Sequence, residues 1–227
     1  MGLSSWFWAK MYDRQMSIAE EACLRTWRRA LLAPLSGDVL EVGAGTGTNV
    51  EHYPDAVRRL VLSEPDRYMR RELQRRVDAA SRQGFASVPG GMNPSRRATS
   101  AAYEVVDAPS ERLPFRAESF DAVVSTLVLC SVADLELALV EIRRVLRPNG
   151  RFVFLEHVAA EDRPQRLLWQ RRIEPFWKRI AGNCHLTRHT EQAIRAAGFE
   201  IADIARESMR KAMPLVRPTI RGHACKI

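Results

Sequence analysis

Five short apolar runs, separated by stretches with helical character, constrain the fold of this chain most. Each run is rich in Val, Leu and Phe, as buried parallel strands are, and they occupy residues 38–42, 59–64, 103–107, 120–129 and 150–158. Between the last two, apolar residues recur at helical spacing until Pro148, Asn149 and Gly150 end the helix. Strand and helix repeated in this order predict an α/β sheet with helices on both faces.

The rest of the chain adds two strands and one long connection. A helix closed by Gly198 is followed by "EIADIARES" and "TIRGHACKI", which have the pattern of final strands. Residues 86–102 consist mostly of Pro, Gly, Ser, Asn and Ala, which predicts a mobile loop with either no role or the role of a lid. A length of 227 residues suits a single domain.

Composition limits the classes of function. The net charge is +8, but nearly all basic residues are arginine, which favours the codon bias of a GC-rich genome over a nucleic-acid interface. An anionic substrate or an acidic lipid surface would also suit this charge. No apolar stretch approaches the ~20 residues of a membrane span, and the N-terminus does not resemble a signal peptide. Four cysteines without C-x-x-C spacing indicate neither a zinc site nor a disulfide framework, and they fit a reducing cytoplasm.

The stretch "DVLEVGAGTGTNVEHYP", residues 38–54, indicates a ligand site. In an open parallel sheet, ligands bind beyond the carboxyl ends of the strands, where this stretch lies. Gly43 and Gly45 allow a tight turn with backbone N–H groups facing a ligand, and a helix is expected from about Thr48. Glu64 ends the second strand, where a carboxylate can accept both ribose hydroxyls of a nucleoside.

The glycine spacing separates two cofactor classes. The dinucleotide fingerprint G-x-G-x-x-G would place its third glycine at Thr48, but here it falls at Gly47. Glu41 precedes the glycines, and its carboxylate would repel a pyrophosphate but attract the ammonium of a methionine group, directly or through water. The combination favours S-adenosylmethionine over a nicotinamide or flavin dinucleotide.

Four segments in this order resemble the class I S-adenosylmethionine-dependent methyltransferases: "LEVGAGTGTN", "SEP" at 63–65, "VVDAPSERLPFRAESFDAVVSTLVL" at 105–129 and "EIRRVLRPNGRFVFLEH" at 141–157. The resemblance covers about residues 35 to 227. It implies a Rossmann-like, mostly parallel sheet of seven strands whose last strand is antiparallel, preceded by a helical lid in residues 1–34.

The resemblance also implies residue roles. The glycines would cradle the methionine end, Glu64 the ribose and Asp107 with Ala108 the adenine, while Ser125, Thr126 and Leu127 would form the floor below the sulfonium. The cofactor-binding residues implied are Tyr12, Glu41, Gly43, Gly45, Gly47, Asn49, Glu64, Pro65, Asp107, Ala108, Ser125, Thr126 and Leu127. Taken singly, the glycines could serve packing, Glu64 could be a solvated strand end and Asp107 a turn residue. The reaction would release S-adenosylhomocysteine.

The acceptor is indicated first by what the chain lacks. No Asn/Asp-Pro-Pro-aromatic motif follows the fourth strand, as methylation of exocyclic amines in nucleic acids would need. No glutamate pair brackets a hairpin, as protein arginine methylation requires, and no Asp-Asp-Asn arrangement suggests the metal site of catechol enzymes. The expected partner is therefore a small molecule rather than a nucleic acid, and no metal is predicted.

The C-terminal third is similar to the vertebrate methyltransferase-like thiol S-methyltransferases and their bacterial relatives. The similarity lies in "FLEHV", the aromatic-rich segment with Trp169 and Trp177, and a turn made of Gly182, Cys184, Leu186, Thr187 and Arg188. It implies a hydrophobic thiol as acceptor. The vertebrate members carry a longer apolar N-terminal anchor than this chain, so at most peripheral membrane contact is expected.

Three residues are candidates for catalysis. His157 and His185 are candidate bases, and Arg188 could hold a thiolate or an acidic group of the acceptor. Each has a structural alternative, a hydrogen-bonded histidine or a solvated charge. A thiol with pKa near 8.5 is already partly ionised at neutral pH and needs little further activation. Two other functions remain open: methylation of a lipid amine, quinone or phenol at a membrane, and a binding module without catalysis.

Overall fold

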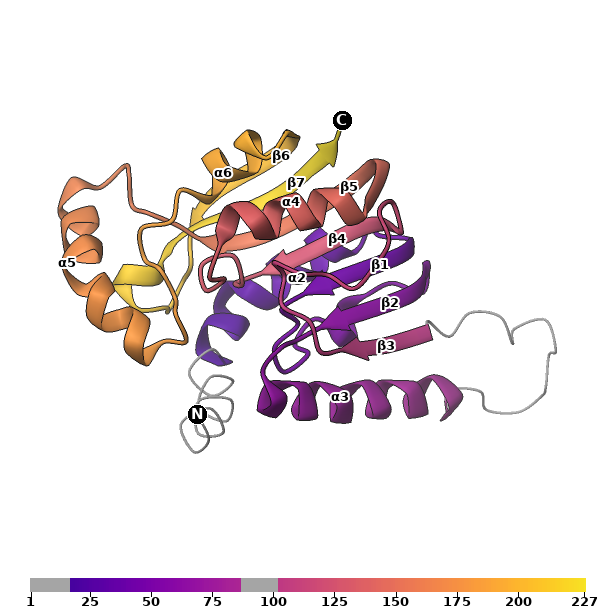
Figure 1. The fold of residues 1–227 in the computed structure, drawn as a ribbon. Coiled ribbons are helices and arrows are strands. Elements are labelled where there is room, and N and C mark those ends of the chain that lie inside the picture. Colours follow the sequence, from indigo (N-terminus) through magenta and orange to yellow (C-terminus); the bar gives the residue numbers. More distant parts are fainter. Residues whose placement is uncertain (1–16, 87–101) are drawn as a thin grey trace.

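The computed structural model describes residues 17–86 and 102–227 (Figure 1). These residues form one seven-stranded sheet flanked by helices. Tyr12 and nearly all of the predicted 86–102 loop lie outside the described residues. The strands are β1 (Gly37–Val42), β2 (Val57–Ser63), β3 (Ala102–Val106), β4 (Phe120–Thr126), β5 (Leu146–His157), β6 (Phe199–Ser208) and β7 (Pro218–Lys226).

The sheet order is β3-β2-β1-β4-β5-β7-β6. Strands β1 to β5 pair in parallel, whereas β7 runs antiparallel to both of its neighbours, β5 and β6. This arrangement confirms the predicted Rossmann-like fold and its antiparallel last strand. In Figure 1, β3 and β6 form the two edges, and the chain crosses over between β3 and β4 from one half of the sheet to the other.

The alternation of side chains along the strands divides the core into two layers. Leu40 and Val42 of β1 pack with α4 (Leu135–Val145) and α6 (Thr190–Ala196) on one face. Val39, on the opposite side of the same strand, packs with α2 (Arg25–Leu32) and α3 (Arg67–Ala86). The π-helical turn η1 (Glu20–Leu24) extends the second layer by packing on Leu155 at the end of β5.

Helix α5 (Pro164–Ile180) lies apart from these two layers, on the side to which β4 points (Figure 1). Its outer side carries three exposed large apolar residues, Leu168, Trp169 and Phe176. Among the described residues, no helix combines the length and the apolarity that crossing a bilayer requires.

Among the differences from the predicted element boundaries, three stand out. The helix expected from about Thr48 is only a 3-10 turn, η2 (Val50–His52), because Pro54 holds the preceding Tyr53 in an extended conformation, with φ −72° and ψ 134°. Strand β4 ends at Thr126 rather than residue 129, since Leu127 has a left-handed φ of 60°. Strand β5 begins at Leu146, directly after α4, rather than at residue 150.

Candidate functional site

The glycine loop follows β1, and its three glycines differ in what surrounds them. All three have positive φ values. A Cβ atom built on Gly43 would lie 2.5 Å from Val128, and one on Gly47 would lie 2.8 Å from Leu73. A Cβ on Gly45 would meet no atom within 4 Å. Gly43 and Gly47 are therefore required by packing, whereas Gly45 opens onto free space.

Glu64 stands at the end of β2 and ties the glycine loop to the next strand. One carboxylate oxygen accepts from the Gly45 N–H at 2.8 Å, and the other accepts from the Asp66 N–H at 2.8 Å. Burial raises the pKa of this carboxyl above its usual range. Each oxygen retains a second lone pair, so the side chain keeps acceptor capacity for a ligand hydroxyl.

Glu41 lies in a buried polar network below the glycine loop. Asn49 Nδ2 donates to one carboxylate oxygen at 2.8 Å, and the Tyr53 hydroxyl donates to the other at 2.7 Å. Burial is the main reason why the pKa of Glu41 is raised to about 7, and the nearby Glu64 charge acts in the same direction. The two hydrogen bonds and the Arg28 charge oppose this shift. The group is poised to gain or lose its proton near neutral pH.

Arg28 of α2 completes this network, and sequence reasoning missed it. The guanidinium is buried, forms an ion pair with Glu20 at 3.0 Å, and donates to Asn49 Oδ1 at 2.8 Å and Thr126 Oγ1 at 2.9 Å. The sequence did hint at a buried arginine, because Arg28 directly follows Trp27 on the buried side of α2. This residue joins the N-terminal helices to the ends of β1 and β4.

A cavity of about 500 Å³ lies over these groups, within the size range of small-molecule sites. Eight of the residues predicted to bind the cofactor line it: Glu41, Gly43, Gly45, Asn49, Glu64, Pro65, Thr126 and Leu127. The sequence did not single out several other lining residues, among them Arg28, Met69, Ser110, Glu111, Val128, Ser131, Val132, Ala133 and Ala181.

Four predicted cofactor residues do not line the cavity. Gly47 packs against Leu73, and the Ser125 hydroxyl is fully buried and donates to Glu156 at 2.7 Å. Asp107 is mostly exposed and pairs with Arg70 at 2.6 Å, while Ala108 is buried. In their place, Pro109, Ser110 and Glu111 face the cavity at this end of the sheet.

The opposite wall of the cavity is a turn, residues 127–133, that follows β4. The turn is bonded to a segment more than 50 residues later in the chain. Asn183 Nδ2 donates to the Ser131 carbonyl at 3.0 Å, and the His185 N–H donates to the Cys130 carbonyl at 2.7 Å. We call residues 127–133, together with Ala181 and Gly182, the acceptor wall; its members in the cavity lining are Leu127, Val128, Ser131, Val132, Ala133, Ala181 and Gly182.

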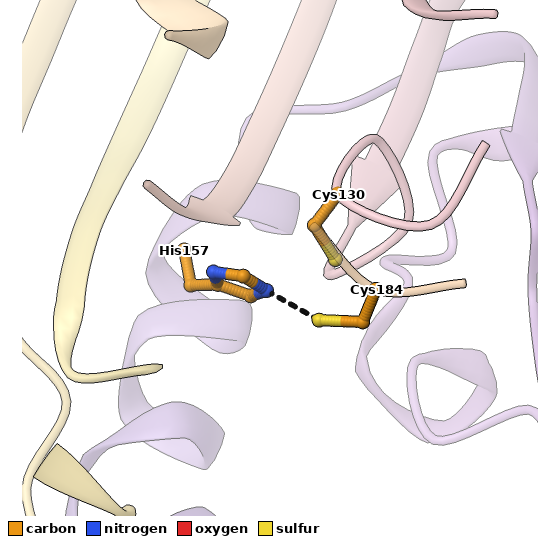
Figure 2. Close-up of side chains that lie close together, drawn as sticks. All are labelled: Cys130, His157 and Cys184. Atoms are coloured by element: carbon orange, nitrogen blue, oxygen red, sulfur yellow. Dashed lines mark hydrogen bonds between the residues drawn. The ribbon is translucent and has the colours of Figure 1, made fainter. Parts of the chain in front are cut away.

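The three predicted catalytic residues lie behind this wall rather than in the cavity lining. The buried His157 places Nε2 3.0 Å from Cys184 Sγ (Figure 2), and its Nδ1 has no hydrogen-bond partner in the described part of the chain. His185 Nδ1 lies 3.8 Å from Glu174 Oε1, and burial together with the Arg188 charge lowers the pKa of His185. Arg188 donates to the Val132 carbonyl at 2.6 Å.

Figure 2 shows that His157 belongs to a cluster with Cys130 and Cys184. The imidazole nitrogen and the two sulfur atoms all lie within 4.8 Å of one another. The contact with the Cys130 thiol, together with burial, raises the pKa of Cys184. Burial lowers the pKa of His157, but the contact with Cys184 has the larger effect, so the pKa of His157 is raised overall. Spacings of 27 residues gave no reason to expect this cluster from the sequence.

The site has the features of one class of enzyme. Gly45 leaves open the space that a close-fitting ligand needs, and Glu64 offers a carboxylate next to it at the carboxyl ends of β1 and β2. These residues fit a nucleoside cofactor bound at the carboxyl ends of the strands. The fold and the site therefore define an α/β protein with a nucleoside-cofactor site.

Comparison with known proteins establishes the family. The model of the "Methyltransferase domain" family matches residues 40–154. Human thiol S-methyltransferase TMT1A is 32% identical over 239 residues, covering 100% of this chain and 90% of that protein. Demethylmenaquinone methyltransferase of Thermobifida fusca is 30% identical, covering 74% and 64%. The chain belongs to the class I S-adenosylmethionine-dependent methyltransferases, and S-adenosylmethionine is its methyl donor.

Solved structures agree with the fold. A possible histamine N-methyltransferase of Thermotoga maritima superposes with a TM-score of 0.65 at 18% identity, covering 98% of this chain and 97% of that one. Geranyl diphosphate methyltransferase in complex with S-adenosylmethionine gives a TM-score of 0.64 at 14% identity, covering 89% and 84%. At these identities the likeness concerns the fold alone.

Proposed function

We propose that this protein methylates the sulfur of a compact, largely hydrophobic small-molecule thiol. The observation that carries the proposal is the similarity to human thiol S-methyltransferase TMT1A along the whole chain. That similarity includes the segment from α5 to α6 as well as the strands that carry the predicted cofactor residues. The segment from α5 to α6 contributes Ala181 and Gly182 to the acceptor wall.

The chemistry of the acceptor wall supports an uncharged, apolar acceptor. Leu127, Val128 and Val132 present aliphatic side chains. Glu111, a carboxylate of the lining, accepts through one oxygen from the N–H groups of Ala133 and Asp134, at 2.7 and 3.3 Å. A cationic amine would lose hydration against the aliphatic side chains of this wall, whereas a thiol group loses little on transfer to such a surface.

The residues of the chain have separate tasks in this reaction. S-adenosylmethionine supplies a methyl group that its sulfonium already activates. Gly45, Glu64 and Glu41 would hold the cofactor, and the acceptor wall would orient the thiol and exclude water. Holding two reactants in line is the main source of rate in such a transfer. Because a thiol is a few per cent ionised at neutral pH, no strong base is required of the chain.

A second candidate is methylation of a quinone or phenol ring at a membrane surface. Its support is the similarity to the demethylmenaquinone methyltransferase of Thermobifida fusca. The exposed Leu168, Trp169 and Phe176 on α5, with arginines among them, would suit a lipid surface.

A panel of matched acceptors tests the proposal. The purified chain is incubated with S-adenosylmethionine and equal concentrations of thiophenol, phenol, aniline or a demethylated naphthoquinone, and the products are identified by mass spectrometry. We expect methyl thioether from thiophenol at a rate well above the other products. A variant with Gly45→Val serves as the inactive control. Preferential methylation of the phenol, the amine or the quinone ring would contradict a thiol acceptor and leave the methyltransferase activity intact.

A further inference from the structure

We propose that Cys130, His157 and Cys184 bind a zinc ion behind the acceptor wall, and that the acceptor thiol is the fourth ligand of this ion. The inference rests on the proposed function, since it assigns the means by which a thiol is held and activated. It begins from the cluster in Figure 2, in which one imidazole nitrogen and two sulfur atoms converge from three separate segments.

The donor set selects the metal. Two cysteine sulfurs and one histidine nitrogen are soft and borderline ligands, which suit zinc and do not suit magnesium or calcium. Two thiolates would balance the charge of a divalent ion, so the site loaded with zinc would be neutral until the acceptor binds as a third thiolate. A neutral site matches its burial, because the three residues are only 2%, 4% and 9% exposed.

The distances fit a metal with small side-chain adjustments. With Zn–S near 2.3 Å and Zn–N near 2.0–2.1 Å, a tetrahedral site separates its ligand atoms by about 3.5–3.8 Å. Here His157 Nε2 and Cys184 Sγ lie 3.0 Å apart, and all three ligand atoms lie within 4.8 Å of one another. The backbone around the cluster is firmly held, since the His185 N–H donates to the Cys130 carbonyl at 2.7 Å.

The number of ligands leaves one position open. Structural zinc sites have four protein ligands, whereas catalytic sites have three and bind water or substrate at the fourth position. Within the described residues the cluster consists of three ligating side chains. The segments that carry two of them also line the cavity: Val128 and Ser131 flank Cys130, and Gly182 precedes Cys184 by two positions. The three ligating side chains themselves do not line the cavity, so an acceptor thiol would reach the ion through the acceptor wall, between the segments that carry Cys130 and Cys184.

Coordination would ionise the acceptor thiol without help from the three candidate catalytic residues that the sequence indicated. His157 is engaged with Cys184, and neither His185 nor Arg188 lines the cavity. A thiol bound to zinc is deprotonated, and its proton leaves to solvent through the cavity. The acceptor sulfur then uses a lone pair to form the bond to the methyl carbon as the carbon–sulfonium bond breaks. The products are a methyl thioether and S-adenosylhomocysteine, and the uncharged thioether is a weaker ligand than the thiolate.

The effect on rate has a definite scale. A thiol with pKa near 8.5 is about 3% thiolate at pH 7, so complete ionisation on the metal raises the reacting fraction by about 30-fold. The lower nucleophilicity of a bound thiolate offsets part of this gain. We therefore expect removal of zinc with a chelator to slow methylation of an alkyl thiol, phenylmethanethiol, at pH 7 by about 10- to 30-fold, and added zinc to restore the rate.

Metal content and a cobalt spectrum test the site on the full chain. We expect about one equivalent of zinc in the wild type and in Cys225→Ser, which removes a cysteine outside the cluster, and its loss in Cys130→Ser and Cys184→Ser. Because a cluster variant could fail to fold, the wild type is also stripped and reloaded with Co²⁺. Thiophenol should then strengthen the sulfur-to-cobalt charge-transfer absorption, whereas phenol should leave it unchanged.

The outcomes separate this inference from the proposed function. If the stripped wild type binds neither metal but methylates phenylmethanethiol at the full rate, the zinc site is wrong and the thiol acceptor stands. If the metal binds but its absorption spectrum does not change when thiophenol is added, the thiol is not the fourth ligand. A disulfide between Cys130 and Cys184 in the purified active enzyme would also overturn the proposal. If the metal and thiophenol bind but methyl goes only to amines, the proposed function fails.

Discussion

Alanine substitutions at Gly45 and Gly47 should separate cofactor binding from folding, although the two residues are only two positions apart. Both residues have positive φ, +57° and +88°. An alanine at either position must adopt a left-handed conformation, which costs roughly 1–2 kcal/mol of stability. At Gly45 the new Cβ meets no atom within 4 Å. At Gly47 it would approach Leu73 Cδ1 to 2.8 Å and Val50 Cγ2 to 3.3 Å, and overpacking of this kind adds about 1–3 kcal/mol.

The expected results are therefore opposite for the two variants. Urea denaturation without cofactor should show a loss of about 1–2 kcal/mol for Gly45→Ala and about 2–5 kcal/mol for Gly47→Ala. Calorimetric titration should show S-adenosylmethionine affinity at least tenfold weaker in Gly45→Ala, about 1.4 kcal/mol or more, because the methyl group enters the cavity. The folded fraction of Gly47→Ala should bind within about threefold of the wild type, since the residue faces Leu73.

Two results would refute this reasoning. Unchanged affinity in Gly45→Ala would mean that the open space beside Glu64 is not where the cofactor binds. Equal losses of stability in the two variants would mean that the contacts around Gly47 do not limit packing. The thermal shift caused by saturating cofactor gives an independent reading, because ligand stabilisation falls with the affinity.

Two further predictions concern the buried network below the loop. The pKa of Glu41 is about 7 in the folded protein, so its carboxyl is neutral below that pH and can attract the cofactor ammonium only above it. Affinity for S-adenosylmethionine should rise with pH through about 7 and fall again above about 8, where the cofactor ammonium loses its proton, and calorimetry should find the rise absent in Glu41→Gln. Arg28→Ala leaves Glu20 unpaired and should cost about 3–5 kcal/mol of unfolding free energy, against little change for the exposed Arg25→Ala on the same helix.

The fold could be predicted from the sequence because its signals are local. Each buried parallel strand is a short apolar run. The apolar side chains on both sides of such strands are buried only when helices cover both faces of the sheet. The ends of strands were less predictable where the backbone conformation of a single residue sets them. Leu127 ends β4 by adopting a left-handed φ of 60°, which is rare for a leucine and leaves no trace in the apolar pattern.

The position of the cavity could also be predicted from the sequence, but the contacts of single residues could not. The sequence placed Glu64 and Gly45 at neighbouring strand ends, and the structure joins them with a 2.8 Å hydrogen bond. It did not show that Asp107 would pair with Arg70 or that Ser125 would be buried against Glu156. These partners come from other strands and helices, so no spacing along the chain records them.

The far wall of the cavity, residues 127–133 with Ala181 and Gly182, was the least predictable part, because it is assembled from segments distant in sequence. Glu156 of β5 accepts from the Ser125 hydroxyl and from the Val128 N–H, which fixes the start of the acceptor wall. The far end of the wall is fixed by Asn183 and Arg188, which donate to the carbonyls of Ser131 and Val132. Changes in the connection from α5 to α6 can therefore reshape the acceptor wall while the glycine loop keeps its geometry.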